Sequence, residues 1–228
     1  MIVITGASRG IGKYLYDYYK ASDVDEEIFG TSNAERSNDL NISQLAIENN
    51  EQVEAWSKSL ANLNPSKITL INCVGIDISS IAHKSCVNDW QRVVQINLIG
   101  TFNVIRAFLP YMRSIEHGRI VNFSSIVAEK GVPGTSSYAA SKSGLWGLSK
   151  AIAAENASKN ITINSINLGY SDIGMGIDKI SDEYRAAILK TIPANRFCQP
   201  QEILDTVQFL TEVGYINGAS ISLNGAAT

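Results

Sequence analysis

The sequence has few cysteines and histidines. It contains three cysteines and two histidines among 228 residues. The cysteines, Cys73, Cys86 and Cys198, are odd in number and widely spaced, which argues against a disulfide framework or a paired-cysteine metal site. The histidines, His83 and His117, have no cysteine or carboxylate nearby at a metal-binding spacing. We therefore expect no metal site in this protein.

The sequence also lacks a basic excess and a long uncharged apolar run. Its 22 acidic residues slightly outnumber its 19 basic residues, giving a formal net charge of −3. A nucleic-acid-binding protein would need a basic stripe, so we expect no such partner. A membrane span needs roughly 18 apolar residues without charge, and we expect none. Because a strand is predicted from Met1, we expect no signal peptide and a cytoplasmic protein.

What the chain does have is an alternation of short apolar runs with helix-like stretches. The apolar runs are hydrophobic on both faces, as parallel strands covered by helices on each side should be. Strands are predicted at 1–5, 27–31, 68–73, 119–124, 162–167 and 220–223. Helices are predicted at 11–21, 51–63, 87–112, 137–158 and 201–211. This order predicts an α/β fold with a doubly wound parallel sheet and helices on both faces.

The length and the absence of linkers favour one domain over residues 1–228. Single α/β domains commonly reach this size, and no low-complexity tract or internal repeat divides the chain. The segment 170–200 differs, because it carries glycines at 174 and 176 with charges interspersed. We interpret it as a mobile segment that covers the substrate.

A glycine-rich turn follows the first predicted strand. Glycines at 6, 10 and 12 allow a sharp turn and a close backbone approach, and the next helix presents free N–H groups to an anion. The spacing lacks the Gly-Lys-Ser/Thr ending of a P-loop, which disfavours a kinase or ATPase. Taken alone, the turn could also simply close a strand onto a helix. The favoured interpretation is a dinucleotide diphosphate site.

Tyr138 and Lys142 lie four residues apart in a predicted helix, and therefore on one face of it. A neighbouring ammonium favours the phenolate and should lower the pKa of the tyrosine toward the range useful for acid/base catalysis. A solvated surface pair is the alternative for such a spacing in isolation.

Further motifs accompany these two sites. They are Asn72 with Gly75, Asn97 within QINLIG, Ser125 within NFSS, IPANRF at 192–197 and INGASI at 216–221, beside Thr5–Gly12 and YAASK at 138–142. Taken together, these motifs resemble the short-chain dehydrogenase/reductase family, over essentially the whole chain, and bacterial 3-oxoacyl-acyl-carrier-protein reductases in particular. The resemblance implies a Rossmann-like fold.

In this family the corresponding residues have assigned roles. The resemblance implies that Tyr138 protonates the carbonyl oxygen, that Lys142 lowers the tyrosine pKa and holds the nicotinamide ribose, and that Ser125 orients the carbonyl. Ser125 is preferred to Ser124 because its thirteen-residue interval to Tyr138 is similar to the family's spacing. Asn97 would anchor a water that relays protons to Lys142, although a cap or kink asparagine is the alternative.

The second predicted strand ends in Gly30-Thr31-Ser32-Asn33, without a carboxylate to bind a ribose 2′-hydroxyl. With Arg9 available to pair with a phosphate, NADP(H) is favoured and NAD(H) is possible; a solvated Arg9 is the alternative. Asp39-Leu40 is similar to the family's adenine-contacting pair, and 41–43 fits almost as well. The predicted cofactor-binding residues are Gly6, Ser8, Arg9, Gly10, Ile11, Gly12, Ser32, Asn33, Asp39, Leu40, Asn72, Gly75, Tyr138, Lys142, Gly169, Ser171 and Ile173.

The predicted function is an NADP(H)-dependent oxidoreductase that reduces a ketone to an alcohol, with a small-molecule carbonyl or alcohol as substrate. Departures from the family pattern, such as Ile173 where a threonine is expected and Asn224 where an aspartate is expected, make a fatty acyl thioester less favoured as the substrate. An enzyme acting on nucleotide-linked sugars and a non-catalytic dinucleotide-binding protein are the alternatives. By analogy with the family, whose corresponding helix packs between subunits, we expect a homodimer or homotetramer.

Overall fold

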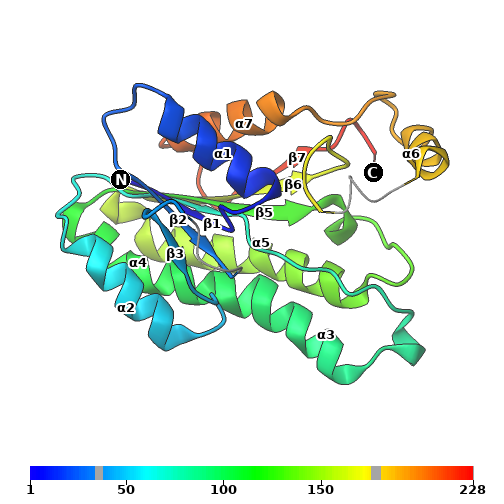
Figure 1. Ribbon diagram of the computed structural model, residues 1–228, viewed down its shortest axis with the longest axis horizontal. Helices are drawn as coiled ribbons and strands as arrows, with labels where there is room; N and C mark the ends of the chain where they lie inside the picture. The colour runs from blue at the N-terminus through cyan, green and yellow to red at the C-terminus, as the bar shows by residue number, and fades with distance from the viewer. Residues whose placement is uncertain (34–37, 176–180, 228) are drawn as a thin grey trace.

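The computed structural model describes residues 1–33, 38–175 and 181–227 (Figure 1). Its centre is one parallel seven-stranded sheet in the order β3-β2-β1-β4-β5-β6-β7. The strands are β1 (Ile2–Thr5), β2 (Ile28–Ser32), β3 (Ile42–Gln44), β4 (Thr69–Asn72), β5 (Gly118–Ser125), β6 (Ile161–Leu168) and β7 (Ser220–Leu223). The predicted α/β class and doubly wound parallel sheet are therefore confirmed.

Two groups of helices cover the two faces of this sheet (Figure 1). The helices α1 (Gly10–Ala21) and α7 (Pro200–Glu212) cover one face, and α2 (Asn50–Ala61), α4 (Thr101–Ile115) and α5 (Ser136–Asn156) cover the other. Alternate residues of β1 divide between the faces, since Val3 packs under α2 and α4 whereas Ile4 packs under α1. This two-sided burial explains why the central strands are apolar on both faces.

The predicted helix 87–112 consists of three parts in the structure. An α-helix, α3 (Val87–Val94), leads into a π-helical turn at Gln95–Gly100, and α4 continues from there to Ile115. By length and composition alone, this 29-residue stretch is long and apolar enough to cross a membrane, although arginines interrupt its apolar run. More than half of its most apolar window, 56%, is buried inside the protein. Such burial is typical of a core helix packed on a sheet.

Two elements of the structure were not predicted. The strand β3 has only three residues and pairs with the end of β2. The helix α6 (Asp182–Leu189) lies within the segment that was interpreted as mobile, and a bridge between Ser171 and Cys198 ties the two ends of that segment together. Its residues 176–180 lie outside the described part of the chain.

The strand order reverses between β1 and β4, because the chain winds outward from β1 in one direction and from β4 in the other. Ligands of doubly wound sheets bind in the crevice at such a point, outside the carboxyl ends of the strands. The first two strands of this crevice end at Thr5 and Asn72, which are paired in register. The fold therefore brings the glycine turn and the segment after β4 to one place.

Candidate active site

The glycine turn after β1 has the backbone that an anion site requires. Gly6 and Gly10 have φ values of +72° and +56°, which side-chain-bearing residues rarely adopt. The N-cap residue of α1, Arg9, makes no side-chain cap, and the first turn of this helix carries no acidic residue. The first N–H groups of α1 are thus available to a phosphate, to which the helix dipole is also complementary.

The third glycine of the turn allows close packing. A Cβ atom at Gly12 would lie 2.3 Å from the carbonyl oxygen of Gly6. The helix can approach the preceding turn only because this atom is missing.

Replacing Gly12 by alanine should therefore push the first turn of α1 away from Gly6. We expect Gly12→Ala to lower the free energy of unfolding by about 1–3 kcal/mol, as overpacking does, and to weaken dinucleotide binding at least about tenfold by moving the N–H groups. Thermal unfolding and fluorescence titration with NADPH measure the two effects. Gly131→Ala is the matched control, since a Cβ at Gly131 would meet nothing within 4 Å. Equal affinities in the two variants would contradict the prediction.

The segment after β6 lies against the glycine turn. A Cβ at Gly10 would be 3.3 Å from the Cα of Gly174, and a Cβ at Gly174 would be 3.5 Å from Ile11 Cδ1. The Ser171 hydroxyl donates to the carbonyl oxygen of Ile173 at 2.5 Å, which shapes this short loop. The structure thus brings Gly10, Ile11, Ser171 and Ile173 together, as expected for one binding site. Gly169 instead serves packing, since a Cβ there would be 2.7 Å from the Cα of Asn224.

The end of β2 also adjoins the glycine turn. The N–H groups of Gly6 and Ala7 donate to the side chain and the carbonyl oxygen of Thr31, at 3.3 and 2.8 Å. Ser32 is buried, whereas Asn33 is exposed, as are Ser8 and Arg9 in the turn. The residues that were predicted to select the cofactor therefore surround one corner of the crevice. Residues 34–37 lie outside the described part of the chain.

The structure does not bring Asp39 and Leu40 to the carboxyl end of β3. Both residues precede this strand, and the side chain of Leu40 is 97% exposed. The Asp39 carboxylate bonds to Lys20 and to the hydroxyl of Tyr16, which lie on α1. The proposed adenine-contacting pair therefore lies before β3, and the alternative at 41–43 runs into this strand; contact of either with adenine stays a prediction. The chain leaves this strand at 45–47 instead.

The side chain of Asn72 faces the interior under α5. Its Nδ2 donates to Asn122 Oδ1 at 2.8 Å, and Asn122 Nδ2 donates in turn to the hydroxyl of Ser149. Its Oδ1 atom is buried and has no partner among the described residues. Only its backbone can border the crevice. Gly75 lies closer to the chemistry, since a Cβ at this position would be 3.3 Å from Lys142 Nζ.

Residues at the end of β5 form hydrogen bonds with one face of α5. The Lys142 ammonium donates to the carbonyl oxygen of Phe123 at 2.7 Å, and the Ser124 hydroxyl donates to the carbonyl oxygen of Lys142 at 3.0 Å. Ser125 instead forms a side-chain hydrogen bond with Tyr138. Ser124 is thus turned beneath the helix, and Ser125 is the serine that meets the phenol. The ammonium lies 5.7 Å from the centre of the Tyr138 ring.

Asn97 lies in the π-helical turn and is completely buried. Its Oδ1 accepts from the N–H of Ile76 at 2.8 Å, and its Nδ2 donates to the carbonyl oxygen of Ile76 and to the hydroxyl of Ser141. The amide therefore clamps the segment after β4 to the helix that carries Tyr138 and Lys142. Single π turns occur frequently at functional sites.

Burial dominates the proton affinities of the two central groups. It raises the pKa of Tyr138 to about 12, and the Asp77 carboxylate acts in the same direction, whereas the hydrogen bond with Ser125 lowers this pKa. Burial lowers the pKa of Lys142 to about 8, with a small opposite effect of Cys73. The direction of the Tyr138 pKa shift is therefore opposite to the lowered pKa that was predicted from its spacing to Lys142, because burial disfavours the phenolate.

Two residues of this region were not predicted as site residues. Trp146 continues the helix face of Tyr138 and Lys142, and its indole N–H donates to Ser124 and Asn167. Asp77 lies near enough to Tyr138 for its charge to act on the phenol. The four-residue periodicity of the helix could have identified Trp146. No sequence signal marks Asp77, which is brought close by the loop after β4.

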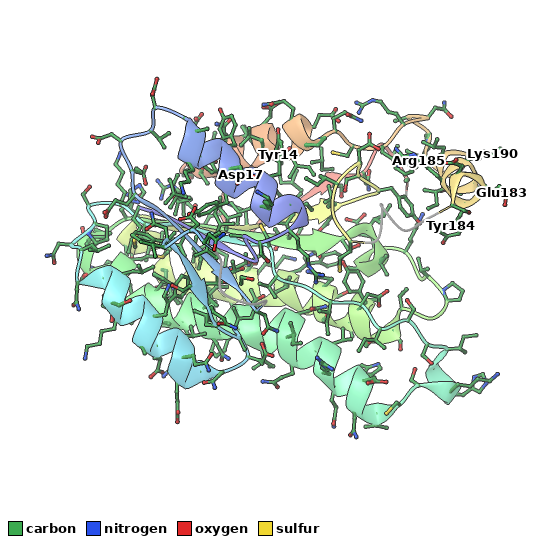
Figure 2. All side chains as sticks on the ribbon, in the orientation of Figure 1. Tyr14, Asp17, Glu183, Tyr184, Arg185 and Lys190 are labelled. Carbon is green, nitrogen blue, oxygen red and sulfur yellow. The ribbon has the colours of Figure 1, made fainter. Side chains whose placement is uncertain are left out.

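The helix α6 shares an apolar cluster, through Ile188, with Ile126 after β5 and Phe197 before α7. Figure 2 shows Tyr184 and Arg185 on this helix, at one end of the molecule. Arg185 forms an ion pair with Asp172, and its guanidinium carbon lies 4.4 Å from the centre of the Phe197 ring. These contacts join α6 to the loop after β6 and to the strand-like residues before α7.

The residues that are present fit a dinucleotide. The positive-φ glycines and the uncapped helix α1 form a backbone cradle for a diphosphate, and Gly75 leaves space beside the Lys142 ammonium that a side chain would fill. Among the described residues, no group of three or more His, Cys, Asp or Glu side chains could hold a metal ion.

Comparisons with known proteins agree with this geometry. A family model described as short chain dehydrogenase matches residues 1–183. The chain is 32% identical to the 3-oxoacyl-[acyl-carrier-protein] reductase FabG of Vibrio cholerae, covering 98% of this chain and 95% of that protein. It is 36% identical to acetoacetyl-CoA reductase of Shinella zoogloeoides, covering 98% and 96%, and 32% identical to nodulation protein G of Rhizobium sp., covering 98% and 94%.

Proposed function

Since this chain belongs to the short-chain dehydrogenase family and is an oxidoreductase, we propose that it reduces a ketone to an alcohol with NADP(H), using Tyr138 as the acid. The observation that carries the proposal is the meeting of Tyr138, Ser125 and Lys142 at the end of β5. The names of the relatives make 3-oxoacyl thioesters the first substrates to test.

The proposed reaction assigns one task to each side chain. When bound, the reduced nicotinamide supplies the hydride that adds to the carbonyl carbon. The hydroxyl of Ser125 orients the carbonyl oxygen by a hydrogen bond. The phenol of Tyr138 transfers its proton to that oxygen as its negative charge develops, which leaves a phenolate beside the Lys142 ammonium. Asn97 keeps Ile76 and Ser141 in place around this pair.

The raised pKa of Tyr138 is suited to the reductive direction. A phenol with a pKa of about 12 remains protonated throughout the neutral range and is ready to donate. The Lys142 ammonium, with a pKa of about 8, is mostly charged at pH 7 and can stabilise the phenolate that forms. Proton donation by Tyr138 and charge stabilisation by Lys142 are thus both available near neutral pH.

A preference for NADPH is proposed because residues 30–33 carry no carboxylate and because Arg9 lies exposed in the glycine turn. Asn33→Asp should reverse this preference, since a carboxylate repels a 2′-phosphate and binds a 2′-hydroxyl. We expect kcat/KM with NADPH to fall at least about tenfold, corresponding to 1.4 kcal/mol of lost transition-state stabilisation, and the value with NADH to rise or stay constant. Steady-state kinetics with both dinucleotides measures this. An equal fall in kcat/KM with NADPH and with NADH would contradict the prediction.

A panel of substrates tests the proposed function. Acetoacetyl-CoA, simple ketones and nucleotide-linked ketosugars are assayed with NADPH and with NADH, and the products are identified by mass spectrometry. Reduction of ketones or 3-oxoacyl thioesters to alcohols would support the proposal. Turnover of nucleotide-linked sugars alone would favour the sugar-nucleotide alternative. Dinucleotide binding without any turnover would favour a non-catalytic binding protein.

The surroundings of the site suggest two further parts of this proposal. The segment 170–200 contains α6 and the Arg185–Asp172 pair and contacts the glycine turn at Gly174, and we propose that it covers the substrate. A homodimer or homotetramer in the cytoplasm is proposed by analogy with the family, and size-exclusion chromatography with light scattering tests the oligomeric state.

A further inference from the structure

The end of β5 binds three successive turns of α5 through three successive residues. Phe123 accepts a hydrogen bond from the Lys142 ammonium, and Ser125 bonds to Tyr138 one turn earlier. Between them, Ser124 accepts a hydrogen bond from the Trp146 indole at 3.0 Å, one turn after Lys142. The residues 138, 142 and 146 share one helix face. Trp146 thus completes a row of three residues. Tyr138 and Lys142 take part in the proposed reaction, whereas Trp146 does not.

The Ser124 hydroxyl connects Trp146 to the backbone of Lys142. It donates to the carbonyl oxygen of Lys142 at 3.0 Å while it accepts from the indole. Ser124 is 4% exposed, and Asn167 beside it is 3% exposed. A hydroxyl that donates and accepts in a water-poor interior has a fixed orientation, because losing either bond leaves a buried polar group unsatisfied.

The same indole N–H reaches a second acceptor. It lies 2.7 Å from Asn167 Oδ1, and Asn167 Nδ2 donates to the Glu129 carboxylate at 2.5 Å. Glu129 also accepts a hydrogen bond from the Ser222 hydroxyl at 2.9 Å. Since Ser124, Asn167 and Ser222 are neighbours in the sheet register, this chain of hydrogen bonds joins α5 to the ends of β5, β6 and β7.

We propose that Trp146 is a positioning residue of the active site, whose indole N–H, acting through Ser124, fixes the turn of α5 that carries Lys142. This inference rests on the proposed function for its kinetic consequence, and on the hydrogen-bond chain for its geometry. Without the indole N–H, the Ser124 hydroxyl keeps only its hydrogen bond to the Lys142 carbonyl oxygen, and the helix turn at Lys142 loses its link to β6 and β7 through Trp146. Water can then reach the ammonium more easily.

Trp146→Phe removes the N–H group and keeps most of the ring. We expect kcat to fall about five- to twentyfold, as loss of a buried hydrogen bond worth about 1–2 kcal/mol does, whereas KM for ketone and cofactor stays within about twofold. Combined with Ser124→Ala, the loss should be less than the product of the two single losses, because both variants break one connection.

Trp56→Phe is the matched control. Trp56 is 7% exposed and packs edge-on against Phe108 in the core under α2 and α4. Its indole N–H has no partner among the described residues. This variant should lower the melting temperature through lost packing and leave kcat unchanged.

The titration of Lys142, followed by NMR of protein with isotope-labelled lysine, gives a readout that does not require turnover. Its titratable neighbours are Tyr138 and Cys73. With better hydration of the ammonium, the pKa of Lys142 should rise from about 8 in Trp146→Phe and remain constant in Trp56→Phe. Where Trp146→Phe does not fold, Ser124→Ala replaces it, because it breaks the same connection with a smaller loss of volume.

An unchanged Lys142 titration, or a kcat within twofold of the wild-type value, overturns the proposal. A shifted titration together with a reduced kcat supports it. If the wild-type protein reduces no ketone or thioester, the proposed function fails, and the titration alone then decides whether Trp146 positions Lys142.

Discussion

Tyr138→Phe is expected to lower kcat for ketone reduction by about 10³-fold, within the range that general acid catalysis contributes. The variant removes the proton donor and one hydrogen bond of Ser125, and leaves the aromatic ring in place. The diphosphate site lies on other elements, so NADPH affinity should remain within about twofold. Single-turnover absorbance at the nicotinamide band measures the chemical step, and fluorescence titration measures the affinity.

Tyr215→Phe is the control for this substitution, because its side chain is fully exposed at a distance from the strand ends that form the site. It should retain the wild-type rate. A Tyr138→Phe enzyme that retains more than about a tenth of wild-type kcat would show that another group donates the proton. Loss of cofactor binding in this variant would instead indicate that the ring has a structural role.

The pH dependence of the wild-type enzyme follows from the two pKa values. Tyr138, with a pKa of about 12, stays protonated up to strongly alkaline pH and should produce no change in the reductive rate below pH 10. The Lys142 ammonium loses its proton around pH 8, so the reductive kcat/KM should be level at pH 6–7 and decline above pH 8. In the oxidative direction the phenolate is needed, and the rate should rise with pH.

Lys142→Met is expected to lower kcat by at least about 10²-fold and to raise the stability of the protein at pH 7. The rate falls because the phenolate loses its neighbouring cation. The stability rises because a buried ammonium is costly: Lys142 is 4% exposed, and its pKa is lowered to about 8. Removing the buried charge should raise the free energy of unfolding by at most about 3 kcal/mol. The lost hydrogen bond to Phe123 reduces this gain to roughly 1–2 kcal/mol.

The stability difference between Lys142→Met and the wild-type protein depends on pH. Between about pH 8 and pH 10.5 the unfolded chain holds a proton on Lys142 that the folded protein has released, so wild-type stability rises with pH across this interval. The advantage of Lys142→Met should therefore be full below pH 8 and vanish near pH 10.5. Urea unfolding at several pH values measures it. Lys150→Met, at an exposed position of the same helix, should change neither property. A destabilised Lys142→Met at pH 7 would refute the argument.

The long, buried elements of the fold could be predicted from the sequence. The strands β5 and β6 are buried along their whole length and extend only one residue at each end beyond the predicted ranges. The short strand β3 was missed because three residues give no readable alternation. The helix α6 was missed because its segment, rich in charge and glycine, resembles a loop until the Arg185 contacts fix it.

The candidate site was predictable where local spacing determines geometry. The four-residue interval places Tyr138 and Lys142 on one helix face, and the glycine spacing predicts the turn after β1. The roles of these residues in catalysis and cofactor binding stay predictions. The position of Asp39 before β3 could not be predicted, because the register of β3 depends on long-range pairing with β2. The direction of the tyrosine pKa was wrong because burial is a property of the folded protein, which no residue spacing reveals.

The π-helical turn at Gln95–Gly100 has a consequence for the whole of α4. Each α-helical residue advances about 100° around the axis, and a π-helical turn takes up more residues than an α-helical turn. The apolar side chains that reach the sheet from α4, Val104, Ile105, Phe108 and Met112, all follow this wider turn. A one-residue deletion within 95–100 should therefore be absorbed by conversion to an α-helical turn, whereas a one-residue deletion after Ile105 should rotate Phe108 and Met112 away from the sheet.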